Sequence, residues 1–216
     1  MQIVSIKTSK IPNQVWITFS DSSFIPFFID DIVKLSLAKN QEIDDSKLET
    51  IIKNCLLFKG KEYALRQIAI SPKTEKIINQ KIKIFLRKII LKYKLNISGL
   101  NLTEINQEII DYLKVKKLLN DLDFINYFVK KNHKKSRQQI IYLLQQHGVD
   151  RNLLSQINLT QENDLTKIKS YLNKKNIDIS KIKDFKEKNK IKSALFRRGF
   201  NISDINIAID DYDEFR

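Results

Sequence analysis

The sequence repeats one glycine-centred pattern three times, and this repeat constrains the fold more than any other feature. Gly99, Gly148 and Gly199 lie 49 and 51 residues apart. Apolar residues stand eight and four positions before each glycine, a spacing that places them on one face of a helix. A glycine after such a face supplies the left-handed residue with which many helices end. The pattern therefore predicts a helix, a glycine-capped turn and a second helix in each repeat.

Three sets of residues at fixed offsets define the repeat. The apolar residues eight positions before the glycines are Leu91, Ile140 and Ile191. The apolar residues six positions after them are Ile105, Leu154 and Ile205. The polar residues predicted to cap the second helix are Thr103, Asp150 and Ser203. We expect both apolar sets to point into the core of the repeat.

A further helix precedes each pair and makes the repeat a three-helix unit. In the first unit a helix is predicted over 63–69. A second helix is then predicted to begin with Ser71 as N-cap and Pro72 as first helical residue, and to reach residue 95. In the second unit Asp121 caps a helix to residue 132, and Ser136 with Gln139 forms a capping box for the next. In the third, Leu165, Ile168, Tyr171 and Leu172 form the leading helix. The units are predicted at residues 61–117, 118–158 and 159–216, stacked in an elongated array because none buries its faces alone.

Residues 1–60 follow a different pattern and are predicted to form a small α+β cap. Apolar residues alternate over 15–19, a polar turn covers 20–23, and an aromatic run follows over 24–29, which together indicate a β-hairpin. Residues 3–6 are a candidate third strand, and Pro26 favours an edge position or a bulge. Helices are predicted at 31–38 and 45–58. The expected fold class is therefore mainly α: tandem three-helix repeats with a small N-terminal cap that contains a β-hairpin.

Cysteine usage and hydropathy bear on the setting of the protein. Cys55 is the single cysteine and lies in an apolar run, so we interpret it as a small buried hydrophobic residue rather than a reactive thiol. No apolar stretch approaches the ~20 residues that a membrane-spanning helix needs. The first residues lack the apolar segment of a signal peptide. We expect a cytoplasmic monomer.

The positive charge is concentrated in one part of the chain. Residues 1–60 carry seven lysines and seven acidic residues, whereas residues 61–216 carry the whole net charge of +14. The abundance of Lys, Ile and Asn is also consistent with coding bias, but such a bias does not explain the asymmetry. An acidic partner, most often nucleic acid, is therefore expected for the helical repeats.

The inventory of chemically reactive groups does not support an enzyme. The two histidines, His133 and His147, lie in a lysine-rich tract and just before a helix-ending glycine, where surface or capping roles explain them. One cysteine and two distant histidines do not make a zinc site. The four glycines are too far apart to form a phosphate loop. We expect no catalytic residues, no metal and no cofactor.

Basic clusters recur in each repeat and are the candidate contact sites for DNA or a protein partner. An elongated positive surface suits a polyanion or a filament with a negative groove, and phosphate contacts of this kind give affinity without sequence reading. The candidate residues are Lys130, Lys131, Lys134, Lys135 and Arg137; Lys188, Lys190, Lys192, Arg197 and Arg198; and Lys114, Lys116 and Lys117.

Four segments, in this order, resemble the RecX family of bacterial regulators of the recombinase RecA. They are 63–69 (YALRQIA) with 71–75, 119–124 (LNDLDF), 136–148, and 190–200 (KIKSALFRRGF). The second is similar to a Leu-Asp-Asp-x-x-Phe element, with Asn120 in place of the first Asp. The third is similar to a basic Ile-x-x-x-Leu-x-x-x-Gly helix, although His133, Lys134 and Lys135 precede it where the family often has a glycine. The likeness covers residues 61 to about 209 well and the first sixty loosely.

The resemblance implies a regulatory protein that lies in the groove of the RecA filament on single-stranded DNA. Such proteins limit filament growth and dampen ATP hydrolysis, strand exchange and co-protease activity, within DNA repair by homologous recombination and the SOS response. The expected partners are the RecA filament and DNA, bound through the filament and weakly alone. The alternative is a stand-alone DNA-binding protein of the helix-turn-helix kind. Apolar and acidic residues in the helices after each glycine, such as 205–209, count against it.

Overall fold

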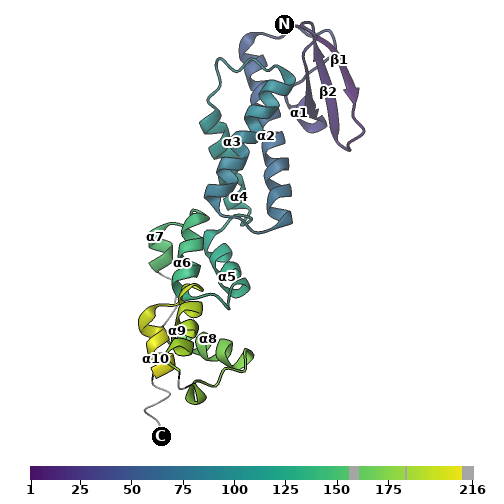
Figure 1. Cartoon of the computed structure of the whole chain (residues 1–216). Helices are drawn as coiled ribbons and strands as arrows, with labels where there is room; N and C mark the ends of the chain where they lie inside the picture. Colours follow the sequence, from purple (N-terminus) through teal and green to yellow (C-terminus); the bar gives the residue numbers. More distant parts are fainter. Residues whose placement is uncertain (156–160, 183, 211–216) are drawn as a thin grey trace. The chain divides into compact units, whose positions relative to one another are not determined.

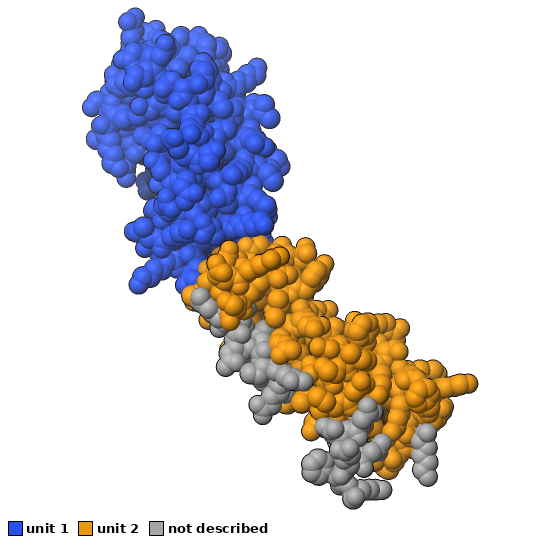
Figure 2. Space-filling model, turned by 90° about the vertical axis from the view of Figure 1, so that its left-hand side faces the viewer, with its two compact units in different colours: residues 1–120 blue, residues 121–216 orange. Residues whose placement is uncertain are grey.

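The computed structural model describes residues 1–155, 161–182 and 184–210 and divides into two compact units. Unit 1 comprises residues 1–120 and unit 2 comprises residues 121–216, coloured blue and orange in Figure 2. One three-stranded sheet precedes a succession of helices (Figure 1). The prediction of a mainly helical protein with a small N-terminal sheet is confirmed.

The sheet of unit 1 consists of β1 (Ile3–Thr8), β2 (Gln14–Phe19) and β3 (Phe24–Phe28), antiparallel in the order β1-β2-β3. Ile17 pairs with Ile25, and both are fully buried. Directly paired residues of neighbouring strands point to the same face of the sheet, which here is the face toward the core. Pro26 lies in the edge strand, as predicted. The helix expected at 31–38 is instead α1 (Ile29–Lys34), since the chain turns left-handed at Ser36 (φ 48°).

A single long helix, α2 (Asp45–Ile70), replaces the two predicted at 45–58 and 63–69. Gly60 lies buried inside it, and a Cβ there would overlap the side chain of Ile109, so this glycine permits close helix packing instead of a break. The domain boundary expected after residue 60 falls within this helix. Helix α3 (Glu75–Tyr93) is capped by Thr74, whose hydroxyl accepts the Ile77 N–H at 3.4 Å, and not by Ser71 as predicted.

The end of α3 corrects the interpretation of the first repeat. Lys94, not Gly99, is the left-handed residue (φ 50°), and the N–H of Leu95 reaches the Ile90 carbonyl at 3.0 Å as in a Schellman motif. The left-handed residue thus lies five positions before Gly99, and Leu91 is 78 % exposed and not inward-facing. Gly99 lies in the following turn. Helix α4 (Leu102–Val115) then begins at Asn101, whose side chain accepts the Thr103 N–H.

One hydrophobic core joins the sheet of unit 1 to α2, α3 and α4, which pack against one another. Ile78, Ile82 and Leu86 contribute a buried stripe from α3 at helical spacing. Cys55 is fully buried in this core, and burial raises the pKa of its thiol to about 12. The interpretation of Cys55 as a small buried residue is confirmed.

Unit 2 contains two successive three-helix groups, each with its own core. The elements are α5 (Asp121–Lys131), α6 (Arg137–Gln146) and α7 (Arg151–Ser155), then α8 (Gln161–Lys174), η1 (Ile179–Lys181), α9 (Phe185–Phe196) and α10 (Ile202–Asp210). The boundary expected between residues 158 and 159 lies outside the described residues. The division into three repeats remains a prediction.

The two glycines of unit 2 behave as the sequence predicts. Gly148 (φ 78°) and Gly199 (φ 81°) end α6 and α9 in the left-handed conformation. Ile140 and Ile191 before them are buried, as are Leu154 and Ile205 after them, and Ile105 in unit 1. Asp150 caps α7 as expected. Asn201 caps α10 in place of Ser203, because its side chain accepts the Ser203 N–H.

Among the described residues, no helix combines the length and apolar character that crossing a bilayer requires.

Candidate functional site

The loop between α5 and α6, with the helix ends beside it, contains one of the two five-residue basic clusters predicted from the sequence. Lys130 and Lys131 end α5, Lys134 and Lys135 lie in the loop, and Arg137 begins α6. The buried Ser136 fixes the start of α6, because its hydroxyl accepts the Gln139 N–H at 3.1 Å. The lysines before it are therefore presented from a defined turn.

Asp164 of α8 ties this loop to the next three-helix group. Its carboxylate is 1 % exposed and accepts the Arg137 N–H through both oxygens, at 3.0 and 2.9 Å. The Lys167 ammonium lies 3.2 Å from the same carboxylate and donates to the Lys135 carbonyl at 2.9 Å. A buried carboxylate that accepts several hydrogen bonds fixes the groups that donate them. The start of α6 and helix α8 are thus held together within unit 2.

Beside this contact the molecule has a cavity of about 510 Å³, which we call the basic pocket. It is formed by the α5–α6 loop, one face of α8 and the turn between α9 and α10. The lining residues are His133, Lys134, Thr166, Lys167, Ser170, Tyr171, Lys174, Lys175, Arg198 and Phe200. The pocket therefore brings together residues that are up to 67 positions apart in the sequence, from 133 to 200.

Helical spacing explains why α8 presents a charged stripe to the pocket. Lys167, Tyr171 and Lys174 stand at positions i, i+4 and i+7, which lie on one face of a helix. The Arg198 guanidinium lies over the Tyr171 ring, 4.4 Å from its centroid. Phe200, 3 % exposed, anchors the turn that contributes Arg198. The ring contact gives Arg198 a defined position at the pocket.

The charge of the basic pocket is uniformly positive. Its described lining includes four lysines, one arginine and one histidine, and neither Asp nor Glu. Lys167 has Asp164 as an ion-pair partner. Within the described ranges, Lys134, Lys174, Lys175 and Arg198 form no ion pair with an acidic side chain. Like charges gathered without counter-charges repel each other, so the pocket favours an anionic ligand.

The structure assigns two of the predicted contact residues, Lys134 and Arg198, to this one pocket and distributes the others. Lys130, Lys190 and Arg197 are exposed outside its lining. Lys131 contacts the Tyr127 ring and hydroxyl. The remaining predicted side chains from unit 2 also lie outside the lining; they are Lys135, Arg137, Lys188 and Lys192.

The predicted basic residues of unit 1 lie at the end of α4. Lys114 pairs with Glu75 at 2.8 Å, so part of its charge is neutralised within the protein. Lys116 and Lys117 follow the helix, and Lys117 is a left-handed residue (φ 55°). These lysines lie at the C-terminus of α4, where positive charge interacts favourably with the helix dipole, so a role in helix stability also explains them.

Sequence reasoning missed four of the basic side chains that line the pocket: His133, Lys167, Lys174 and Lys175. Helix α8, which contains Lys167 and Lys174 and ends just before Lys175, was predicted from its apolar residues alone. The spacing of Lys167 and Lys174 was the available signal. Their meeting with Lys134 and Arg198 depends on the packing of three separate segments, which no local pattern encodes.

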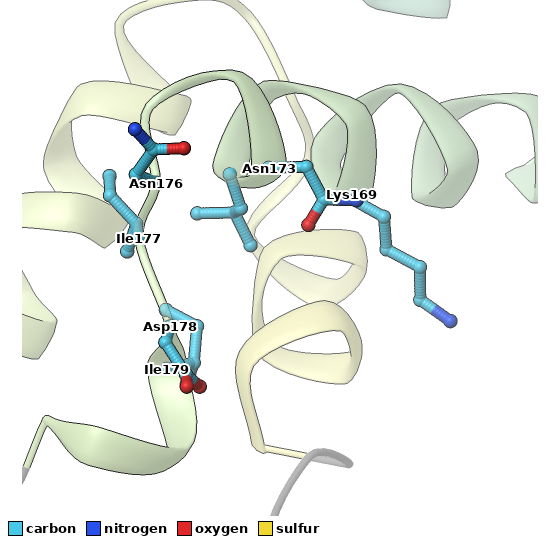
Figure 3. A pocket seen from close by; sticks show the side chains of 7 residues that line it. Lys169, Asn173, Asn176, Ile177, Asp178 and Ile179 are labelled. Atoms are coloured by element: carbon cyan, nitrogen blue, oxygen red, sulfur yellow. The ribbon is translucent and has the colours of Figure 1, made fainter.

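Another cavity of unit 2, of about 440 Å³, has a different character (Figure 3). It surrounds the turn after α8, and Lys169 extends away from Asp178 in this view. Hydrogen bonds from the Ser180 hydroxyl, and then from Lys181, lower the pKa of Asp178. The Asp178 carboxylate is therefore already engaged by two residues of the turn that follows it. No group of His, Cys, Asp and Glu side chains able to hold a metal ion occurs in the described part of the chain.

Comparisons with known proteins match the chain over most of its length. Residues 162–209 match the model of the third three-helix domain of RecX. A solved structure of regulatory protein RecX superposes with a TM-score of 0.65 over 97 % of this chain and 98 % of that chain, at 18 % identity. The resemblance to the RecX family is confirmed. RecX from Lactobacillus salivarius, at 21 % identity, gives a TM-score of 0.55 over 74 % of this chain and 98 % of its own.

Relatives by sequence carry the same name, regulatory protein RecX. That of Clostridium botulinum (strain Eklund 17B / Type B) is 25 % identical over 185 residues, covering 83 % of this chain and 81 % of the relative. That of Streptococcus mutans serotype c is 27 % identical over 189 residues, covering 85 % and 67 %. The RecX-like fold is thus accompanied by sequence similarity to regulatory proteins across both units.

Proposed function

We propose that this RecX-like protein regulates a RecA-type recombinase by binding its filament on single-stranded DNA. Its expected effect is to limit filament extension and to lower ATP hydrolysis, strand exchange and co-protease activity. The role is regulatory and not catalytic. The cytoplasmic location and the monomeric state expected from the sequence belong to the same proposal.

The observation that carries the proposal is the similarity to RecX proteins over more than four fifths of the chain. The charge distribution supports it. The basic pocket gathers cations with neither Asp nor Glu in its described lining, and the net charge of +14 lies outside residues 1–60. A filament that contains DNA offers a long, negatively charged surface to such a protein.

The proposal is tested by the ATPase rate of a RecA recombinase on single-stranded DNA, measured with substoichiometric amounts of this protein. We expect the rate to fall at molar ratios well below one, because blocking extension at a few positions affects many subunits. An unchanged ATPase rate and an unchanged filament length by electron microscopy at every ratio would contradict the proposal.

A pair of matched variants tests whether the basic pocket belongs to the contact surface. Lys134→Ala/Arg198→Ala removes two positive charges from the pocket, and Lys130→Ala/Arg197→Ala removes two from the neighbouring surface. We expect the first variant to need about tenfold more protein for half-maximal inhibition, corresponding to roughly 1.4 kcal/mol. The second should stay within about twofold, because these two charges lie outside the pocket lining. Equal inhibition curves would remove the pocket from the contact surface.

The alternative, sequence-specific duplex binding by a helix-turn-helix, has less support. Helix α10, which follows Gly199, buries Asp204, Ile205 and Ala208. A recognition helix needs an exposed polar face that reaches base edges. Tight binding to one duplex sequence, without any effect on the recombinase, would favour this alternative.

A further inference from the structure

We propose that the basic pocket is a phosphate-binding site, which takes a phosphoryl group of a nucleic acid strand or of a free nucleotide. The inference rests on the proposed function for its biological setting, but the chemistry of the pocket is independent of any recombinase. The two sources share the same recognised group, and the experiment below distinguishes them.

Charge is the first reason. Four lysines and one arginine line a cavity whose described lining has no carboxylate, although residues 121–209 contain several acidic side chains. Asp164, which pairs with the pocket residue Lys167, is buried and also accepts the Arg137 N–H. It therefore neutralises at most part of the local charge. The remaining cations lie close together and repel one another, so a bound anion would stabilise them.

Geometry is the second reason, and it favours phosphate over a carboxylate. The cations come from three separate segments: Lys134 from the α5–α6 loop, Lys174 and Lys175 from the end of α8 and the residue after it, and Arg198 from the α9–α10 turn. A planar carboxylate is served well by a single bidentate arginine. A tetrahedral phosphate, with oxygens in several directions, gains from donors that surround it. Hydroxyl side chains of Thr166 and Ser170 also line the pocket.

Preorganisation and size are the third reason. The Tyr171 ring positions the Arg198 guanidinium, and Asp164 positions the Lys167 ammonium, so part of the ordering is complete before a ligand arrives. The volume of about 510 Å³ lies within the range of small-molecule sites and exceeds what one phosphate fills. An adjoining sugar or a second phosphate therefore has room.

The test measures binding of three probes to the full chain at low salt, without recombinase. Inorganic pyrophosphate and ATP are titrated calorimetrically, and a fluorescein-labelled oligothymidylate is followed by anisotropy. We expect Lys134→Ala/Arg198→Ala to weaken pyrophosphate binding at least about tenfold, whereas Lys130→Ala/Arg197→Ala changes it less than about twofold. The two variants have the same net charge and remove the same side-chain types, so overall charge does not separate them.

Lys174→Ala/Lys175→Ala is a second pocket variant that leaves the contact between Tyr171 and Arg198 intact. We expect it to weaken the same probes, with an unchanged far-ultraviolet circular dichroism spectrum. Equal affinity of all variants for pyrophosphate, or equal losses in pocket and control variants, would overturn the proposal. So would an absence of pyrophosphate, ATP and oligothymidylate binding by the wild-type protein.

Competition identifies the source of the phosphate. If a nucleic acid strand uses the pocket, pyrophosphate displaces oligothymidylate, and the pocket variants lose both probes. If a free nucleotide uses it, the variants lose pyrophosphate and ATP but keep oligothymidylate. Either result supports the phosphate site. Failure of the recombinase assay alone would overturn the proposed function and leave the phosphate site standing.

Discussion

Left-handed residues end many of the helices, and within the described part of the chain two of them are glycines. Lys94, Lys117 and Asn176 occupy the same region as Gly148 and Gly199. The N–H of the residue after each one reaches back to the last helical turn, for example Ile177 to the Leu172 carbonyl at 3.0 Å. A side chain in this conformation costs roughly 1–2 kcal/mol, which the closing hydrogen bonds and apolar contacts offset. Searching for glycine alone therefore misses helix ends of this kind.

Gly199 is the position where this residue choice matters most, and we predict that Gly199→Ala destabilises unit 2 by about 1–2 kcal/mol. Its φ of 81° disfavours any Cβ, and a Cβ there would lie 3.0 Å from the Ser136 hydroxyl that caps α6. The measurement is urea unfolding of the variant against the wild type.

Gly99→Ala is the matched control for Gly199→Ala. Gly99 has no positive φ, and its added methyl would meet the side chain of Glu49, which can move aside. We expect a change below about 0.5 kcal/mol. Similar losses in the two variants would contradict the assignment of the left-handed role to Gly199 and not to Gly99.

At the scale of elements, apolar periodicity predicted the helices well, and helix boundaries less well. The inward-facing Ile140, Ile191 and Ile205 were predictable because each lies at helical spacing within one short segment. The continuity of α2 through Gly60 was not, because a glycine that permits contact with Ile109 resembles one that ends a helix. The caps at Asn101 and Asn201 lie two residues before those predicted, since either polar residue fits the local pattern.

The contact between α8 and the start of α6 has a measurable consequence. We predict that Asp164→Ala lowers the stability of unit 2 by about 2–3 kcal/mol, because a buried carboxylate with charged and backbone donors is lost. Hydrogen exchange at the Arg137 amide should accelerate more than exchange at amides of α4 in unit 1. Unchanged protection at Arg137 would show that the carboxylate does not hold this turn.

At the scale of the molecule, the candidate site was predictable only in part. The sequence identified Lys134 and Arg198 as basic and accessible, because charge clusters are visible locally. It did not pair them, since the pocket depends on how α8 lies between the α5–α6 loop and the α9–α10 turn. Their meeting is a tertiary property, whereas the net charge that suggested an anionic partner is a property of composition.

The hydrophobic cores predict how the chain divides. One core uses buried residues from Ile3 to Leu119, and the two others use residues from Phe124 to Ile209. We predict that fragments 1–120 and 121–216, made separately, are each helical by circular dichroism and unfold cooperatively on heating. The fragment 118–158, an expected three-helix unit, should not fold alone, because it lacks Asp164 and Gly199. A cooperative transition of that fragment would contradict this division.

The start of α6 contacts two residues that come later in the sequence, Asp164 and Gly199, and this affects folding during synthesis on the ribosome. Arg137 is synthesised 27 residues before the carboxylate that accepts its amide hydrogen. Gly199 follows Ser136 by more than sixty residues, an interval of roughly 3–12 s at ordinary translation rates. In a nascent chain the start of α6 therefore lacks its final contacts until Asp164 and Gly199 have been synthesised. A protein truncated within its last third would therefore lose stability in the helices before the truncation, in addition to the helices that are removed.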